Sequence, residues 1–237
     1  MKLKLYYTYL GTLLFLACSP TQTLQSYEDK VVAIQASADS TALAIIAPYQ
    51  SAIEEEMNEV LSYTKYDLEK AKPQSTLGNF VTDLCLNYAD ADICVMNNGG
   101  LRTTINTGNI TRGKLYELMP FENELVVLEL NENDYLGLLN YICKRGGEPF
   151  SGINITMNEE GEIINHSQPV DFSKGEKIRV LTSDYLANGG DKMSFFQNKE
   201  QIKVGTKLRD AIIDYCTKTD TISIELDDRI KIISNEQ

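Results

Sequence analysis

Histidine is almost absent from this chain, since His166 is the single one among 237 residues. Enzymes that activate water with two metal ions use several histidines beside Asp, Asn and Glu, so the chain is not expected to build such a centre alone. His166 stands in a polar stretch, residues 165–167, and no nucleophile motif accompanies it, which argues against a Ser-His-Asp type of hydrolase. We expect His166 to be a surface loop residue, and we assign no catalytic residue, metal ligand or cofactor to this chain.

Positive charge is also scarce. Lysine and arginine number 22 against 34 aspartate and glutamate residues, which gives a formal net charge of −12. No basic stripe is present that could displace counterions from a long nucleic acid, so nucleic acid is excluded as a partner. A single nucleotide held by one local arginine is still compatible with this charge.

The long apolar run of the chain, residues 5–17, follows a basic start at residues 1–4. The run is too short to span a bilayer as a helix, and a small residue precedes Cys18. This pattern is typical of a bacterial lipoprotein signal, with residues 1–17 as the signal peptide and Cys18 lipidated. An ordinary secretory signal cleaved nearby is the alternative. We therefore expect a lipid-anchored protein of the bacterial cell envelope, facing the periplasm or the cell surface.

The chain from Cys18 onward is expected to form a short lipidated tether over residues 18–29 and one domain over residues 30–237. Metal knuckles need paired cysteines, and no cysteine spacing in the domain matches one. The envelope permits disulfides, but buried free thiols are the simpler interpretation. The four cysteines concerned are Cys85, Cys94, Cys143 and Cys216.

Helical and strand patterns mix along the domain without a regular βαβ repeat, so we predict an α+β fold in which mixed sheets pack against helices. Apolar spacing and capping residues predict helices over residues 41–61, 76–88, 111–119, 131–144 and 204–217. Apolar or alternating runs predict strands over residues 30–37, 92–96, 124–130, 177–183 and 229–233, with a hairpin over 153–164.

Three short segments place polar or aromatic groups beside glycine or proline. They are Asn97-Asn98-Gly99-Gly100-Leu101-Arg102, Pro120-Phe121-Glu122-Asn123, and Asp184-Tyr185-Leu186-Ala187-Asn188-Gly189-Gly190-Asp191. Together they supply a guanidinium, two rings, two amides and a carboxylate, which are the groups needed to hold a phosphorylated nucleoside. Taken singly, each segment is equally well explained as a turn with a surface arginine, a core ring or a turn aspartate.

In this order and spacing, the segments resemble the C-terminal, substrate-binding domain of the 5′-nucleotidases and UDP-sugar hydrolases. The resemblance begins near Tyr49, passes through Leu77-Gly78-Asn79-Phe80 and covers most of the mature chain. It implies the fold of that domain and a nucleotide or nucleoside as the small-molecule partner.

The resemblance also implies roles for single residues. Phe121 and Tyr185 would sandwich the base, with Tyr185 in place of a family phenylalanine. Arg102 would contact phosphate and Asp191 would hold the ribose. The base edge would contact the amides of Asn97 and Asn123. A family glycine falls on Gly146 or Gly147, and Gly147 is included among the candidate binding residues.

Two departures from the family stand out. Its second phosphate-binding arginine has no counterpart in residues 70–76, where Lys72 could act only as a point charge. Its N-terminal metallophosphatase domain has no counterpart either, so divalent metals are expected only in a partner. We interpret the chain as a nucleotide-binding domain that works with a separately encoded metallophosphatase on nucleotides or nucleotide sugars. A non-catalytic envelope nucleotide receptor and a structural lipoprotein are the alternatives.

Overall fold

The computed structural model describes residues 39–234. The chain divides into two compact units, residues 1–44 and 45–237. The described part of the first unit is the start of helix α2, Ser40–Met57, whose backbone N–H groups at Thr41 and Ala42 donate to Asp39. Asp39 therefore caps this helix. The predicted lipidation site Cys18 and the strand expected over residues 30–37 lie outside the described residues.

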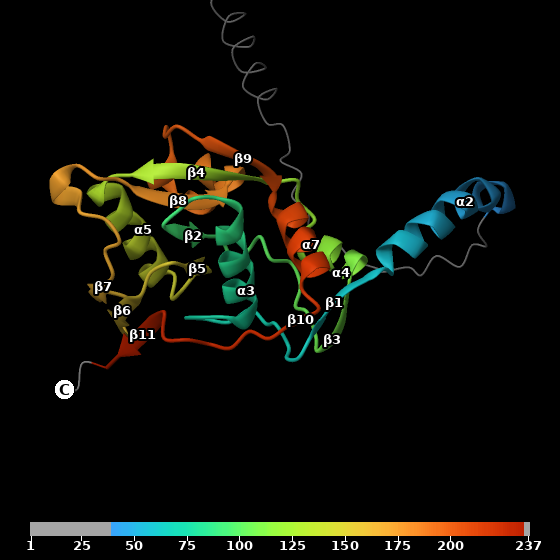
Figure 1. The fold of residues 1–237 in the computed structure, drawn as a ribbon, viewed down its shortest axis with the longest axis horizontal. Helices are drawn as coiled ribbons and strands as arrows, with labels where there is room; N and C mark the ends of the chain where they lie inside the picture. The colour runs from blue at the N-terminus through green and yellow to red at the C-terminus, as the bar shows by residue number, and fades with distance from the viewer. Residues whose placement is uncertain (1–38, 235–237) are drawn as a thin grey trace, which may run out of the picture. The chain divides into compact units, whose positions relative to one another are not determined.

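The second unit is organised around a five-stranded sheet with the order β5-β2-β8-β4-β9 (Figure 1). Its strands are β2 Ile93–Val95, β4 Glu124–Leu130, β5 Phe150–Ser151, β8 Ile178–Ser183 and β9 Ile202–Lys207. β2 and β8 run parallel, whereas β4 is antiparallel to β8 and to β9, and β5 is antiparallel to β2. The sheet is therefore mixed.

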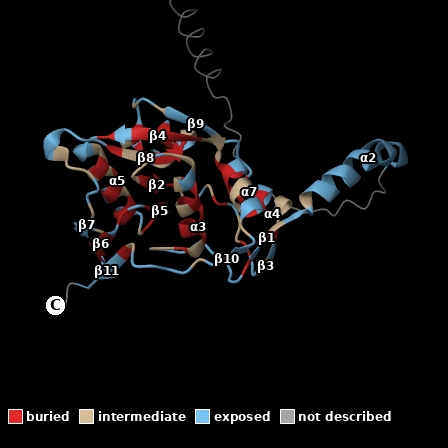
Figure 2. Cartoon of the chain, viewed as in Figure 1, coloured by how far each residue is buried: buried red, intermediate tan, exposed pale blue. Residues whose placement is uncertain are grey.

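Both faces of this sheet are buried, which explains why its central strands are almost continuously apolar (Figure 2). Successive side chains of a strand point to opposite faces. Leu125 and Val127 of β4 accordingly join one core cluster, and Val126 and Leu128 join the other.

Helices cover the two faces. α3 Thr76–Cys85, α4 Arg112–Leu118 and α7 Leu208–Lys218 contribute buried side chains to the first cluster. α5 Glu132–Lys144 contributes Tyr135, Leu138, Leu139 and Ile142 to the second. The sheet thus has a helical layer on each face, which fixes its strand ends in place.

Two three-stranded sheets complete the fold. One has the order β10-β1-β3 and the other β11-β6-β7. Their strands are β1 Val60–Thr64, β3 Gly108–Thr111, β6 Ile155–Asn158, β7 Ile163–His166, β10 Thr221–Ile222 and β11 Ile230–Ile233. The short helical pieces are η1 Leu86–Tyr88, η2 Phe172–Lys174, α6 Asp184–Ala187, η3 Gly190–Lys192 and η4 Ser194–Phe196.

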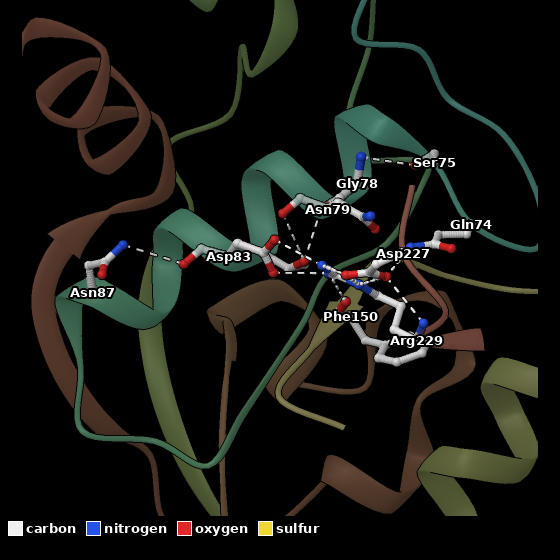
Figure 3. A network of polar contacts seen from close by, with 10 residues as sticks. Gln74, Ser75, Gly78, Asn79, Asp83, Asn87, Phe150, Asp227 and Arg229 are labelled. Carbon is white, nitrogen blue, oxygen red and sulfur yellow. Dashed lines mark hydrogen bonds and ion pairs between the residues drawn. The ribbon is translucent and has the colours of Figure 1, made fainter. Parts of the chain in front are cut away.

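Arg229, just before β11, ties the C-terminal segment to helix α3 (Figure 3). Its side chain is 11% exposed, and its two terminal nitrogens donate to the Asp83 carboxylate oxygens at 2.9 Å each. It also donates to Asp227 and to the carbonyl of Phe150. A forked, mostly buried guanidinium of this kind fixes orientation as well as distance.

The predicted α+β class is confirmed, and so are most elements. β4 has the predicted bounds, and Thr111 and Asn131 cap α4 and α5 by accepting from Lys114 N and Asp134 N. The turn of the predicted hairpin lies at Gly161, between β6 and β7.

Three predictions are wrong in part. Val60 and Leu61 lie in β1 rather than at the end of the preceding helix, because they pair with β3. Residues 204–207, predicted as the start of the last helix, belong to β9, Ile202–Lys207. His166 is half-buried in β7, with its ring 5.7 Å from the Tyr135 ring, and is not a surface loop residue.

The four cysteines of the domain are free and buried, as predicted. Burial raises the pKa of the Cys143 thiol to about 11 and that of Cys216 to about 12. In residues 39–234, we find no helix with the length and apolar character needed to cross a membrane.

Candidate nucleotide-binding site

The strand order brings the three sequence segments to one edge of the central sheet (Figure 1). β2 and β8 are parallel, with Cys94 opposite Leu181, so the segments that follow them emerge at the same edge. β4 is antiparallel to β8, with Leu125 opposite Ser183, so the segment that precedes β4 arrives there too. Residues far apart in the chain thereby meet at one place.

A cavity of about 370 Å³ lies where these segments meet. Its lining contains six of the seven predicted binding residues and two glycines. The lining residues are Asn97, Gly99, Gly100, Arg102, Phe121, Asn123, Tyr185 and Asp191. Residues selected from three separate stretches of sequence therefore form one continuous wall.

Phe121 and Tyr185 expose large aromatic surfaces in this cavity, with 43% and 46% of each residue accessible. Neither ring is a core residue, so the core alternative for Phe121 is wrong. The Tyr185 ring packs closely against Gly190, where a Cβ would lie 2.5 Å from the ring atom Cε1, so only glycine leaves room for the ring. Two exposed rings that line one cavity are candidates for contact with a flat ligand.

The Asp191 carboxylate is held in place by two donors. The amide nitrogen of Asn97 donates to its Oδ2, and the Tyr185 hydroxyl donates to its Oδ1 at 3.1 Å. Asp191 has a φ of 51°, a left-handed conformation that is uncommon for a residue with a side chain. The hydroxyl of Tyr141 donates to its carbonyl at 2.8 Å and supports this conformation. Strained backbone that neighbouring groups hold in place is frequent at binding sites.

Arg102 lies at the cavity with its guanidinium available. Its Nη1 donates to the carbonyl of Gly99 at 3.2 Å, and its Cζ lies 5.9 Å from the centre of the Phe121 ring. Among residues 39–234, no carboxylate forms an ion pair with it. Most N–H donors of the guanidinium therefore stay free for an anion.

Asn123 precedes β4, and its side chain is fixed from behind. The amide nitrogen donates to Asp184 Oδ1 at 3.0 Å, and the backbone carbonyl accepts from Leu208 N at 2.9 Å. The amide therefore has a defined orientation where it lines the cavity.

A buried carboxylate supports the segment that carries Asn97. The side chain of Glu148 is fully buried and accepts from the backbone N–H of Asn98 at 2.8 Å and from Arg145 Nε at 2.6 Å. Arg145 lies over the ring of Tyr141. Burial raises the pKa of Tyr141 to about 12, although the positive charge of Arg145 acts to lower it. Since Tyr141 also supports Asp191, this group of side chains connects α5 to two sides of the cavity.

A second group supports Phe121. Glu122 forms ion pairs with Lys207 and Arg209, and Arg209 also donates to the carbonyl of Met119 at 3.4 Å. Hydrogen bonds from Lys207 and then Arg209 lower the pKa of the Glu122 carboxyl. These contacts hold the backbone on both sides of Phe121, so the ring is presented by a rigid turn.

Gly147 is the one candidate residue outside the cavity lining. It has a φ of 113°, and a Cβ there would lie 2.0 Å from the carbonyl oxygen of Pro73. It follows the end of α5, where its N–H donates to the carbonyl of Ile142 at 2.9 Å. Close backbone packing explains this glycine. Lys72 also points elsewhere, since its Nζ donates to the carbonyl of Arg145.

Sequence reasoning missed the supporting residues Glu148, Arg145, Tyr141, Asp184 and Arg209. No short pattern marks them, because each acts on a segment that is distant in the chain. The one local signal is that a charged residue, Glu148, directly follows the two glycines at the end of α5. Within the part of the chain that the structure describes, no group of three or more His, Cys, Asp and Glu side chains is arranged to hold a metal ion.

Comparison with known proteins gives consistent matches. The family model described as "5'-nucleotidase, C-terminal domain" matches residues 58–198. An apyrase from Tabanus yao is 26% identical over 223 residues, which cover 78% of this chain and 40% of the apyrase. A 5'-nucleotidase from Vibrio vulnificus is 27% identical over 65% of this chain and 30% of its own length.

Among solved structures, a 5'-nucleotidase precursor from Thermus thermophilus superposes with a TM-score of 0.69 at 25% identity. The match covers 83% of this chain and 44% of that structure. The chain thus spans less than half the length of each of these relatives. The expected resemblance is confirmed, and the chain belongs to the 5'-nucleotidase C-terminal domain family, whose members are substrate-binding domains.

Proposed function

We propose that this chain binds a nucleoside or nucleotide in the cavity between its three segments. The observation that carries the proposal is that two exposed rings, one carboxylate and one guanidinium without an acidic partner line the same cavity of about 370 Å³. Each group suits a different part of a nucleotide. Family membership and the printed names of the relatives support a nucleotide as the ligand class.

In this proposal, the base stacks on Phe121 and Tyr185, and such stacking contributes about 1–3 kcal/mol per base. Asp191 accepts from the ribose hydroxyls, as acidic residues do in dinucleotide folds. Arg102 donates to phosphate oxygens. Asn97 and Asn123 contact the base edge.

The ring pair gives the decisive experiment. Calorimetric titration with adenosine and AMP should give affinities that fall by more than about 1 kcal/mol in the Phe121→Ala and Tyr185→Ala variants. Tyr66→Ala is the matched control, because Tyr66 is 51% exposed and does not line the cavity. Unchanged affinity in both ring variants, or no binding by the wild type, would leave the structural lipoprotein as the better interpretation.

We further propose that the chain supplies the substrate-binding half of an envelope hydrolase. A separately encoded metallophosphatase would supply the metals and act on nucleotides or nucleotide sugars. The single histidine among the 237 residues supports a division of this kind, because a two-metal centre uses several. The pure chain should release no phosphate from AMP in the presence of divalent metal, and turnover by the pure chain would overturn the two-protein proposal.

The second candidate function is a receptor that binds nucleosides without hydrolysis. The position of Lys72 favours this receptor role. Its ammonium donates to the carbonyl of Arg145, and Lys72 does not line the cavity, so Arg102 is the cation of the lining. Equal affinity for adenosine and AMP would support this receptor. Clearly tighter binding of AMP, lost in Arg102→Ala, would support the hydrolase role.

Anchoring by a lipid on Cys18 is part of the proposal for an envelope role. The supporting pattern is the basic start, the apolar run of residues 5–17 and the small residue before Cys18. A Cys18→Ser variant expressed in a bacterial host should move from the membrane fraction to the periplasmic fraction. Unchanged membrane association would contradict lipidation at this residue.

A further inference from the structure

We propose that Asp184 fixes the amide of Asn123 with its oxygen toward the cavity, so that the site selects a nucleobase edge that carries an N–H donor. Asp184 would be a positioning residue that determines specificity without touching the ligand. The inference rests on the proposed nucleoside binding and adds which edge chemistry the site accepts.

The chemistry of Asp184 decides the orientation of the amide. Asp184 is the first residue of α6, and its Oδ1 accepts from Tyr185 N at 2.8 Å and from Asn123 Nδ2 at 3.0 Å. An ionised carboxylate only accepts hydrogen bonds, whereas the two ends of an amide are a donor and an acceptor. The end of Asn123 that faces Asp184 must therefore be the nitrogen, so this orientation follows from chemistry rather than from the similar shapes of oxygen and nitrogen.

The position of the cavity decides which end meets a ligand. Asn123 belongs to the cavity lining and Asp184 does not. Asp184 therefore engages one N–H of the Asn123 amide and holds the nitrogen end toward a residue outside the lining, so Oδ1 is the end directed at a ligand. The residue offers an acceptor to the base.

Asn97 repeats the arrangement on another segment. Its amide nitrogen donates to Asp191 Oδ2, so its nitrogen is likewise engaged by a carboxylate. Each amide of the lining thus has one of its two N–H groups held by a carboxylate, and both retain oxygen lone pairs. Together with Asp191, these oxygens make an acceptor-rich wall in which Arg102 is the cationic donor.

A donor-bearing base edge complements such a wall. In adenosine, the base has one donor group, the exocyclic amine, and purine riboside is the same molecule without that amine. The pair therefore isolates the hydrogen bond that the amide oxygen is proposed to accept. One net hydrogen bond corresponds to about a three- to tenfold difference in affinity.

The test measures dissociation constants of adenosine and purine riboside for the full chain by calorimetric titration. The wild type is expected to prefer adenosine by about three- to tenfold. In Asp184→Asn, the new amide can donate as well as accept, so Asn123 is free to turn and the preference should fall to about twofold or less. Asp228→Asn, a charge-matched change at a carboxylate with 85% side-chain exposure, should keep the wild-type preference.

The ratio of two affinities on one protein does not move when a variant only loses stability. Should Asp184→Asn fail to fold, the wild-type ratio still decides. Equal binding of the two ligands by the wild type, or an unchanged ratio in folded Asp184→Asn, would overturn the inference while nucleoside binding stands. Tighter binding of purine riboside than of adenosine would also overturn it, and failure to bind any nucleoside would overturn the proposed function as well.

Discussion

Replacing Glu148 by glutamine is expected to weaken both the fold and ligand binding, although Glu148 does not line the cavity. Its fully buried carboxylate accepts from Asn98 N at 2.8 Å with one oxygen and from Arg145 Nε at 2.6 Å with the other. Glutamine keeps the shape but turns one oxygen into an NH₂ group, which then faces a donor in either orientation. One hydrogen bond is therefore lost, and the other loses its charge.

The magnitude can be worked from these two bonds. A hydrogen bond to a charged group contributes about 1.5–3 kcal/mol and a neutral one about 1 kcal/mol. The Arg145 side chain is 44% exposed, so its share is reduced by solvent screening. The free energy of unfolding should fall by about 2–3 kcal/mol, because one bond is removed and one is weakened. For a domain of this size, that corresponds to a decrease of about 5–10 °C in melting temperature.

The same change should reduce ligand affinity, because Glu148 positions the backbone between Asn97 and Gly99. Urea unfolding and calorimetric titration with AMP measure the two effects. Glu117→Gln is the matched control, since its carboxylate is 68% exposed and forms only a surface pair with Lys114 at 3.2 Å. A loss of stability no larger than that of the control, with unchanged affinity, would refute the supporting role of Glu148.

Three further changes probe the site and the core. Gly190→Ala should weaken nucleoside binding severalfold and lower stability, because its Cβ would lie 2.5 Å from the Tyr185 ring and 2.6 Å from the Tyr185 carbonyl oxygen; unchanged affinity in a titration would contradict this. Lys207 and Arg209 lower the pKa of Glu122 below its usual 4.5, so Glu122 adds stability above that pH and loses it as pH falls through the lowered value. The melting temperatures of wild type and Glu122→Gln should therefore differ at pH 7 and converge toward acid, and a constant difference would contradict this. All four thiols of the domain are buried, and burial raises the pKa of Cys94, Cys143 and Cys216, so a thiol reagent at pH 8 should react with the thiols only after denaturant is added; rapid native labelling would be inconsistent with the core.

Elements with strong local patterns were predictable from the sequence. β4 is apolar at nearly every position because both of its faces are covered, and its bounds were predicted correctly. Asn131 and Thr111 are capping residues whose signals are local, so α4 and α5 were found as well. These elements fix the edge of the sheet at which the candidate site lies.

Elements that depend on distant partners were not predictable. Val60 and Leu61 continue the apolar spacing of α2, yet they form β1 because β3 and β10 pair with that strand. The weak local pattern of residues 204–207 favours a helix, yet these residues belong to β9 because β4 pairs with that strand. Tertiary pairing overrides local propensity in both cases.

The candidate binding residues could be named because each lies in a short, unusual segment, whereas their supports could not. Asp184 illustrates the difference. It was visible only as the residue before Tyr185, and its contact with Asn123 joins positions that are 61 residues apart. Such contacts exist only once β4 and β8 are paired, so the orientation of a binding amide is a property of the fold rather than of its segment.

The pattern of used and unused hydrogen-bonding groups limits what this cavity can hold. One N–H of each of the Asn97 and Asn123 amides is held by a carboxylate, which leaves their oxygens as acceptors, while Arg102 retains most of its donors. A complementary ligand must therefore bring donors to the amides and the carboxylate and an anion to the guanidinium, with a flat apolar part for the rings. An acidic peptide lacks the flat donor-bearing part, and a simple sugar lacks both the flat part and the anion. A nucleotide brings its amino-bearing base, its ribose hydroxyls and its phosphate in this order along one molecule, which is why it is the ligand class that the cavity favours.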